Sequence, residues 1–254
     1  MAGAKQKREE NPNASALAMD SKFKKYAPEA EKVVRTAEVK QDPEMAGKLH
    51  ELRSFWGCYL LAVENYVRYK VSHYTNTDGD EYTSADEAGE YQEALDVLRP
   101  YAHMFSAKHI EAFCLSMQDF MHDAALSVSL PGLFLSALVN LTGEKSYVLP
   151  VGHIPKGLHC LGYHNTKDLV INGNVGSRAG MGMENGSMLI KGDAEDVGCA
   201  MKGGTISVEG DAKSSIGWNM DGGEIHVEGG LSEHLCSGVR KGRIYHKGEL
   251  IVDK

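Results

Sequence analysis

The chain has 254 residues, of which 42% are hydrophobic and 24% charged, and its mean hydropathy is −0.33. These values are typical of a globular protein large enough for two domains, and they exclude a mainly disordered chain or one that crosses a membrane several times. The formal net charge of −8 argues against a general nucleic-acid-binding protein, which would normally be basic, so we expect no nucleic-acid partner.

The cysteines and the first residues bear on the compartment. The five cysteines at positions 58, 114, 160, 199 and 236 include no Cys-x-x-Cys pair, so neither a disulfide framework nor a four-cysteine zinc site is indicated. A basic stretch without an apolar run behind it begins the chain, and we interpret residues 1–20 as a disordered tail, not a signal peptide. We therefore expect a cytoplasmic protein in a reducing compartment, with no membrane partner.

Glycine and proline divide the chain into two parts. Only 6 of the 28 glycines precede residue 143, and all seven prolines lie at or before Pro155. A break of this kind marks a domain boundary, which we place near residues 143 to 150. We predict a helical bundle over residues 21–145 and a glycine-punctuated domain over residues 146–254.

Apolar residues recur at helical spacing in the first part. The clearest case follows an Asp-Pro-Glu start at residue 42, which supplies a cap, a proline at the first helical position and an acidic first turn. A second helix is predicted to begin at Ser84, three residues before Glu87, and to end before Pro100. The expected helices cover residues 43–73 and 84–98, begin near Ser106 and follow Pro131, with a weaker, strongly charged helix over residues 23–39. Joined by short connections, they should pack as an antiparallel bundle.

The longest apolar stretch runs over residues 126–141 and is interrupted by serine, proline and glycine. We interpret it as a core or interface segment, because burial against the second domain explains it without lipid. Attachment to a membrane surface is the less favoured alternative.

The second part repeats every 18 or 19 residues. Glycines of one column stand at 173, 192, 210, 229 and 248, and those of a second column stand at 186, 204, 223 and 242. Five apolar columns keep the same step: Leu169, Met188, Ile206, Ile225 and Ile244; Ile171, Ile190, Val208 and Val227; Val175, Ala194, Ala212 and Leu231; Ala179, Val197, Ile216 and Leu235; and Met183, Met201, Met220 and Val239. These columns predict a continuous stacked core.

Each period contains a short strand, such as residues 205–210, in which polar and apolar residues alternate, so every second side chain points inward. Glycine suits the corners because the chain turns sharply there while lying about 4.8 Å from the next coil. A period of 19 residues is too short for a strand and a crossover helix. The repeat therefore predicts a parallel β-helix of about four to five coils, with an N-terminal cap near residues 150–168.

The repeat also carries a family resemblance. The sequence GGTISVEGDAKSSIGWNMDGG at residues 203–223, nearly repeated at 185–204, resembles the GXGXG β-helix domain over roughly residues 165–250. That domain occurs at the C-terminus of the glutamate synthase large subunit and in one of the subunits of formylmethanofuran dehydrogenase. The resemblance implies a right-handed parallel β-helix of GXGXG type for the C-terminal part. Together with the helical bundle that the periodicity predicts for the N-terminal part, the expected fold is α+β. The resemblance also implies a structural role, because in those enzymes the domain scaffolds other parts and does not hold the cofactors.

Three patterns raise the question of a binding site. His153, His159, Cys160 and His164 gather possible zinc ligands at the domain junction, although a role in capping the solenoid is favoured. The acidic segment from Asn76 to Glu87 has the length of a calcium-binding loop, but its sixth position lacks the glycine that the turn demands, which favours a solvated loop. Gly180, Gly182 and Gly186 superficially resemble a nucleotide-binding loop but occupy repeat corners. We assign no catalytic residue, no cofactor-binding residue and no metal ligand.

Two functions follow as hypotheses. The first is a non-catalytic scaffold or protein-interaction subunit, oligomeric or part of a larger complex. The alternative is an accessory subunit of a redox or glutamine-amidotransfer enzyme related to glutamate synthase or formylmethanofuran dehydrogenase. Such a subunit would contribute a pocket at the junction of the two domains, using the histidines and the cysteine named above. Whether the protein is itself an enzyme is left open, because a fold does not determine a function.

Overall fold

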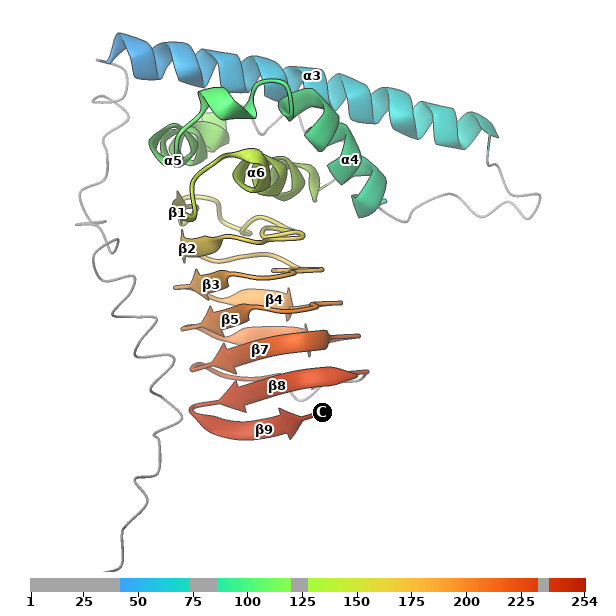
Figure 1. Ribbon diagram of the computed structural model, residues 1–254, viewed down its shortest axis with the longest axis vertical. Coiled ribbons are helices and arrows are strands. Elements are labelled where there is room, and N and C mark those ends of the chain that lie inside the picture. Colours follow the sequence, from blue (N-terminus) through green and yellow to red (C-terminus); the bar gives the residue numbers. More distant parts are fainter. Residues whose placement is uncertain (1–41, 74–85, 120–127, 233–237) are drawn as a thin grey trace, which may run out of the picture.

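The computed structural model describes residues 42–73, 86–119, 128–232 and 238–254. Within these ranges, four α-helices precede nine strands that stack below them (Figure 1). The fold is α+β, with a helical part followed by a parallel β-solenoid of about five turns, as predicted. The tail expected over residues 1–20 and the weak helix expected over 23–39 lie outside the described residues.

The four helices agree with the periodicity of the sequence. They are α3 (Pro43–His73), α4 (Glu87–Leu98), α5 (Ala107–Ser116) and α6 (Leu130–Leu141), with short 3₁₀ turns at Ala102–Met104 and Met117–Asp119. The start of α4 differs from the expectation, because Asp86 is the cap and accepts a hydrogen bond from the backbone N–H of Gly89. A carboxylate satisfies a free N–H of the first turn at least as well as a serine does.

Helix α6 lies between the other helices and the first coil of the solenoid (Figure 1). Its side chains are buried all round, and Leu133, Phe134 and Leu138 are fully buried. The prediction that this apolar stretch is a core segment is therefore confirmed for residues 129–141. It is wrong for Val128, which is 71% exposed, and residues 126–127 lie outside the described ranges. No described helix is both long and apolar enough to span a membrane.

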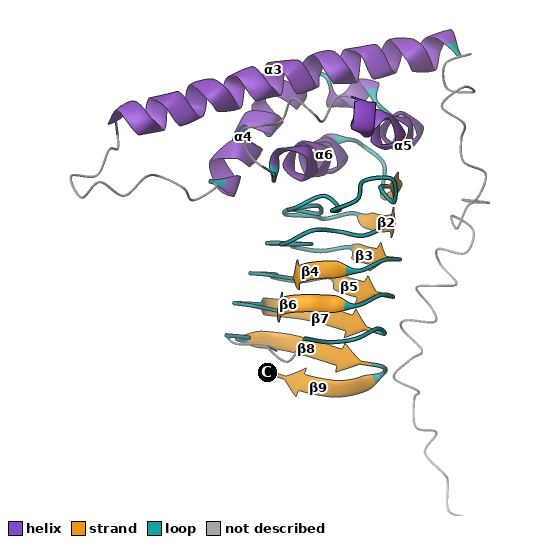
Figure 2. Cartoon of the chain, turned by 180° about the vertical axis from the view of Figure 1, so that it is seen from behind, coloured by secondary structure: helices purple, strands orange, loops and turns teal. Residues whose placement is uncertain are grey.

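The strands form two sheets on opposite sides of the solenoid (Figure 2). The larger sheet holds β1 (Ser146–Pro150), β2 (Asp168–Asn172), β3 (Ser187–Ile190), β5 (Thr205–Val208), β7 (Asp221–Val227), β8 (Lys241–His246) and β9 (Glu249–Asp253). The smaller sheet pairs β4 (Ala194–Val197) with β6 (Ala212–Ile216). Residues 150–168, where the cap was expected, contain the rest of the first coil, since Leu158 pairs in parallel with Val175 of the next.

The register of the strands matches the columns of the sequence repeat. Leu169 pairs with Met188, Met188 with Ile206, Ile206 with Ile225, and Ile225 with Ile244. Gly186 shows why the corners are glycine: its φ is +75°, and a Cβ there would lie 2.2 Å from the carbonyl oxygen of Lys167 in the coil above. Leu235, the last member of the column that begins at Ala179, lies outside the described ranges.

The last strand departs from the repeat. Lys247 and Gly248 both have positive φ, +50° and +79°, and they form a two-residue turn that brings β9 back antiparallel to β8. Gly248, which the sequence places in a column of corners, therefore belongs to a hairpin. The hairpin ends the stack by pairing the edge of β8 with the chain's own final strand.

One hydrophobic core runs through both parts. It includes Leu52 and Tyr59 of α3, α6 beneath them, and the inward columns of the solenoid as far as Ile244. Burial of this kind holds the helices and the coils together as one body.

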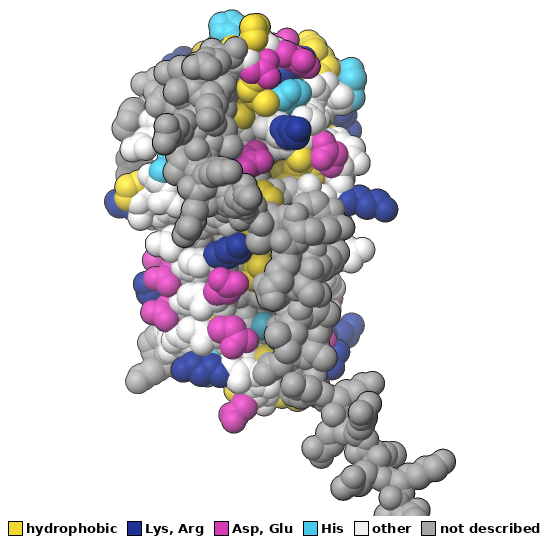
Figure 3. Space-filling model, turned by 90° about the vertical axis from the view of Figure 1, so that its left-hand side faces the viewer, with side chains coloured by type: hydrophobic (Ala, Val, Ile, Leu, Met, Phe, Trp, Pro, Cys, Tyr) yellow, Lys and Arg dark blue, Asp and Glu magenta, His cyan; other side chains and the backbone are white. Residues whose placement is uncertain are grey.

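Side-chain oxygens join successive coils at the corner that follows each strand of the larger sheet. Asn174 Oδ1 accepts a hydrogen bond from the backbone N–H of Asp193 at 2.9 Å. Asp193 Oδ1 in turn accepts one from Asp211 at 2.9 Å, and Asp211 Oδ1 accepts one from Gly230 at 2.7 Å. Lys213 Nζ lies 3.1 Å from the other oxygen of Asp193. Figure 3 shows acidic side chains stacked along this side of the solenoid.

We expect the Asp193 carboxylate at this corner to make the free energy of unfolding depend on pH. The pKa of Asp193 lies below its usual range, first because the carboxylate accepts the Asp211 N–H and second because Lys213 is adjacent. A lowered folded-state pKa stabilises the protein above the unfolded pKa of about 3.9, and this contribution is lost as pH falls through the folded value. Asp193→Asn keeps the side-chain oxygen that accepts the Asp211 N–H but loses the negative charge. Between pH 7 and about pH 3 the free energy of unfolding should therefore fall less in the variant than in the wild type, and the two losses should differ by under about 1 kcal/mol.

The measurement is the free energy of unfolding in urea at several pH values. Glu209→Gln is the matched control, because it removes an exposed carboxylate but leaves the Asp193 hydrogen bond in place. Equal acid sensitivity in wild type and Asp193→Asn would contradict the assignment.

Candidate functional site

Polar side chains of α6 bind the backbone of the first coil. Ser136 Oγ accepts a hydrogen bond from the N–H of Gly162 at 2.9 Å, deep in the interface. One turn further along the helix, Asn140 Nδ2 donates to the carbonyl oxygens of Tyr163 at 3.1 Å and His164 at 3.2 Å. The helix thus satisfies backbone groups that a further coil would otherwise bind, and it caps the solenoid.

A groove opens beside this contact, between the helices and the first coils. It has a volume of about 440 Å³. Its walls come from α4, α6 and the corners of two coils, and the lining residues are Ala88, Tyr91, Gln92, Leu95, Asn140, Tyr163, His164, Thr166 and Glu184. A groove of this size with a few polar groups among apolar ones is the usual form of a small-molecule site.

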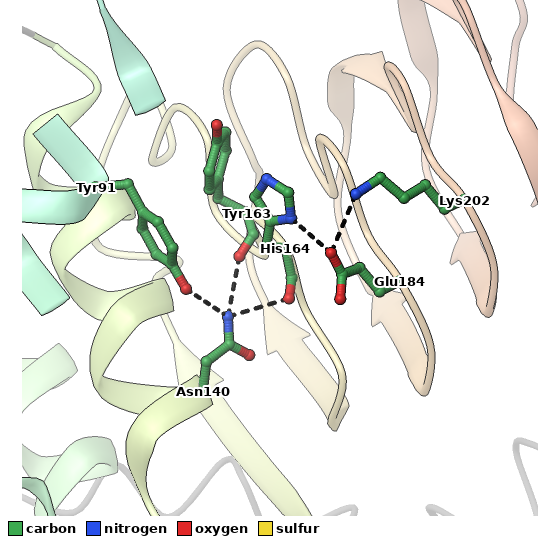
Figure 4. Close-up of polar contacts among 6 residues, drawn as sticks. All are labelled: Tyr91, Asn140, Tyr163, His164, Glu184 and Lys202. Carbon is green, nitrogen blue, oxygen red and sulfur yellow. Dashed lines mark hydrogen bonds and ion pairs between the residues drawn. The ribbon is translucent and has the colours of Figure 1, made fainter. Parts of the chain in front are cut away.

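One side of the groove is aromatic. The ring of Tyr91 packs against that of Tyr163 with centroids 4.8 Å apart, and it stacks on His164 at 6.1 Å and 25°. Asn140 Nδ2 also donates to the hydroxyl oxygen of Tyr91 at 2.9 Å (Figure 4). Burial raises the pKa of Tyr91, the Asn140 hydrogen bond acts in the opposite direction, and the negative charge of Glu184 raises the pKa further. The hydroxyl therefore stays protonated at neutral pH.

The other side of the groove is lined by charged side chains. Glu184 Oε1 lies 3.0 Å from His164 Nδ1 in the coil before it and 3.1 Å from Lys202 Nζ in the coil after it, so the carboxylate joins three successive coils (Figure 4). The hydrogen bond from His164 lowers the pKa of Glu184, and that from Lys202 lowers it further. A planar ligand in the groove would meet aromatic faces on one side and an ionised carboxylate on the other.

Buried ionisable groups lie near the groove where α4 meets the second coil. Glu87 forms an ion pair with Arg178. Cys160 is fully buried, and burial raises its pKa to about 11, so its thiol is not reactive at neutral pH. These groups join the helices to the solenoid and do not open into the groove lining.

The structure separates the four zinc-ligand candidates. His153 and His159 are half-buried, Cys160 is buried, and His164 faces Glu184 in the groove. In the part of the chain that the structure describes, no three His, Cys, Asp or Glu side chains come together in a way that would hold a metal ion. Of the proposed calcium loop, residues 76–85 lie outside the described ranges, while Glu87 belongs to α4 and pairs with Arg178.

Sequence reasoning found one residue of the groove, His164, and missed the others. Tyr91 fits the apolar face of a helix, which is how its spacing is interpreted, and Glu184 and Lys202 lie at repeat corners like many other charged residues. Asn140 was the detectable signal, because it is the amide that interrupts an apolar helix near its end. A polar side chain in such a helix needs partners, and those of Asn140 are the Tyr91 hydroxyl of α4 and two carbonyl oxygens of the solenoid.

Comparison with protein-family models, curated proteins and solved structures gives no match to this chain. The groove is therefore interpreted from its geometry.

The variant Asn140→Asp tests whether the hydrogen bonds of Asn140 join α6 to the first coil beside the groove. At neutral pH the substitution places carboxylate oxygen against two carbonyl oxygens, so we expect a loss of about 2 kcal/mol in the free energy of unfolding. The loss should shrink in acid, because a protonated carboxyl group can donate again. Gln92→Glu is the control: its amide bonds to the exposed Asp96, and a change below about 0.5 kcal/mol is expected. Equal effects of the two variants would show that Asn140 does not join the helix to the first coil.

Proposed function

We propose that the protein is a non-catalytic scaffold that associates with copies of itself. The observation that carries the proposal is the single core that joins the helices to the solenoid, because it holds separate surfaces at fixed distances. We further infer that the solenoid is right-handed and of GXGXG type, which is the domain that organises other subunits in glutamate synthase and formylmethanofuran dehydrogenase.

Helix α3 offers the surface for association. Its 31 residues extend for about 46 Å, and its C-terminal turns continue past α4 (Figure 1). Leu61 and Tyr69 of α3 are 62% and 55% exposed, which is unusual for large apolar side chains. Pairing of two such helices would bury them, and the self-complementary contact of a twofold dimer is the commonest arrangement.

Sedimentation velocity of the full chain tests the proposal. We expect a dimer or larger species at micromolar concentration, and a shift to monomer in the variant Leu61→Glu/Tyr69→Glu. Lys145→Glu introduces a charge change at an exposed site away from α3 and should leave the assembly intact. A wild-type protein that stays monomeric up to about 100 micromolar would contradict the proposal.

A second function is favoured by the groove. An accessory subunit of a redox or amidotransfer enzyme would hold a ligand at the junction of its two parts, and the groove lies there with His164 in its wall. Native mass spectrometry and an absorption spectrum of protein purified without a tag distinguish this function from the first. A bound small molecule that Tyr91→Ala releases supports it, whereas a mass equal to that of the bare chain removes its support.

A further inference from the structure

Strand β9 leaves one edge of the larger sheet open. It is the last strand in the order of that sheet, so β8 pairs with one of its edges and none of the described strands pairs with the other. Figure 1 shows β9 at the opposite end of the molecule from α3, with no described element beyond it. An open edge presents a row of backbone N–H and C=O groups that can pair with another strand.

The side chains of β9 do little to protect this edge. Leu250 is 49% exposed and Ile251 40%, and within the strand only Val252 packs against the core. Ile251 also has no partner in β8, because the register shifts by one residue at this point. Natural proteins usually cover or charge such edges, whereas adjacent exposed apolar side chains mark a surface that meets a partner.

The hydrogen bonds of the hairpin determine which backbone groups of β9 are turned to the open edge. Lys254 exchanges two backbone hydrogen bonds with Gly242, each of 3.1 Å. Glu249 follows the two-residue turn directly and is bonded to β8 in the same way. Because bonded and outward-facing residues alternate along an antiparallel strand, the backbone groups of Leu250 and Asp253 point away from β8.

The charges of β9 are complementary to those of a second copy lying antiparallel to it. Pairing of the outward backbone groups places Leu250 of one chain opposite Asp253 of the other. In this register Glu249 lies opposite Lys254, and twofold symmetry forms the pair twice. A register shifted by one residue would place Glu249 opposite Asp253, two like charges.

We propose that β9 pairs with β9 of a second copy, antiparallel and in the register that sets Glu249 against Lys254. The larger sheets of the two copies then form one continuous sheet across a twofold axis. A contact over residues 249–254 is smaller than the roughly 1,200 Å² of a stable complex, so we expect a Kd near about 1 mM. It therefore adds to association only well above micromolar concentration.

The β9 contact is independent of the pairing of α3. Only its consequence for assembly rests on the proposed function. With α3 paired at one end of the molecule and β9 at the other, two different twofold contacts would join copies end to end in an open chain (Figure 1).

Charge reversal tests the proposal in the full-chain variant Leu61→Glu/Tyr69→Glu, in which α3 does not pair and which we call the parent. Adding Glu249→Lys opposes two lysines across the contact, and adding Lys254→Glu opposes two glutamates. Each protein alone should associate about tenfold more weakly than the parent in sedimentation equilibrium up to about 1 mM. An equal mixture of the two restores both Lys–Glu pairs and should associate at least as well as the parent. Lys191→Glu, the same charge change at an exposed site of β3's coil, should have no effect.

Amide hydrogen exchange in the parent locates the contact. The amides of Leu250 and Asp253 should exchange about twofold more slowly at about 1 mM than at about 10 micromolar, whereas those of β6 should not change. A parent that stays monomeric at about 1 mM, a mixture that associates no better than its components, or protection of other residues alone would overturn the proposal. None of these outcomes bears on α3, because its two substitutions are present throughout.

Discussion

Replacing Gly132 by alanine is expected to lower the free energy of unfolding by about 3 kcal/mol, even though alanine is the better helix former. Gly132 lies in the first turn of α6, where the helix rests on the first coil. A Cβ at this position would lie 1.9 Å from the carbonyl oxygen of His159 and 3.0 Å from its carbonyl carbon. Both are backbone atoms, so no side-chain rotation relieves the clash. The helix must shift, which weakens the hydrogen bonds of Ser136 and Asn140.

Urea denaturation of the full chain measures this effect, and Gly47→Ala is the matched control. Gly47 lies in α3, and a Cβ there meets nothing within 4 Å. Alanine should therefore stabilise the protein at this site by up to about 1 kcal/mol. The two glycine-to-alanine variants are thus expected to have effects of opposite sign. A Gly132→Ala protein as stable as the wild type would mean that α6 is not pressed against the first coil.

Ile206→Ala is expected to cost about 3 to 4 kcal/mol. Ile206 is fully buried in the middle of the solenoid, in register between Met188 and Ile225. Its Cδ1 reaches the corner of the coil above, where it would meet a Cβ on Gly180 at 2.5 Å. Truncation leaves a cavity in a rigid stack of backbone, which cannot collapse to fill it.

Ser207→Ala is the control for this variant, because the two residues are adjacent and point to opposite sides of the sheet. Removing a buried hydroxyl that has no partner among the described residues should leave stability unchanged or raise it. Thermal and urea unfolding of both variants check the prediction. A greater loss in Ser207→Ala than in Ile206→Ala would mean that the inward and outward sides of the strand are reversed.

Periodicity made the solenoid predictable. Inward residues recur at 18 or 19 positions because each coil must present the same side chains to its neighbours, and the strand pairs of Leu169, Met188 and Ile206 follow that spacing residue for residue. The antiparallel strand β9 was not predicted, because Gly248 fits the glycine column as well as it fits a two-residue hairpin. The turn depends on Lys247 adopting positive φ, which its residue type does not signal.

The groove was less predictable for a different reason. It depends on how the helices sit on the first coil, and contacts between Asn140 and the carbonyls of Tyr163 and His164 join residues more than 20 positions apart. Neither partner has a periodic neighbour that would reveal the contact. Glu184 is positioned by the repeat, but its partner His164 comes from the coil before the clear repeat begins.

Disulfide formation between engineered cysteines tests the stacked coils most directly. Lys191 and Glu209 are exposed and follow the paired residues Ile190 and Val208, so they occupy adjacent coils about 4.8 Å apart. In a chain whose native cysteines are replaced by serine or alanine, Lys191→Cys/Glu209→Cys should crosslink under mild oxidation. Lys191→Cys/Glu228→Cys, two coils apart at about 9.6 Å, should not, because disulfides need Cα atoms within about 7 Å. Equal crosslinking of the two pairs, or crosslinking of the second pair alone, would contradict the solenoid.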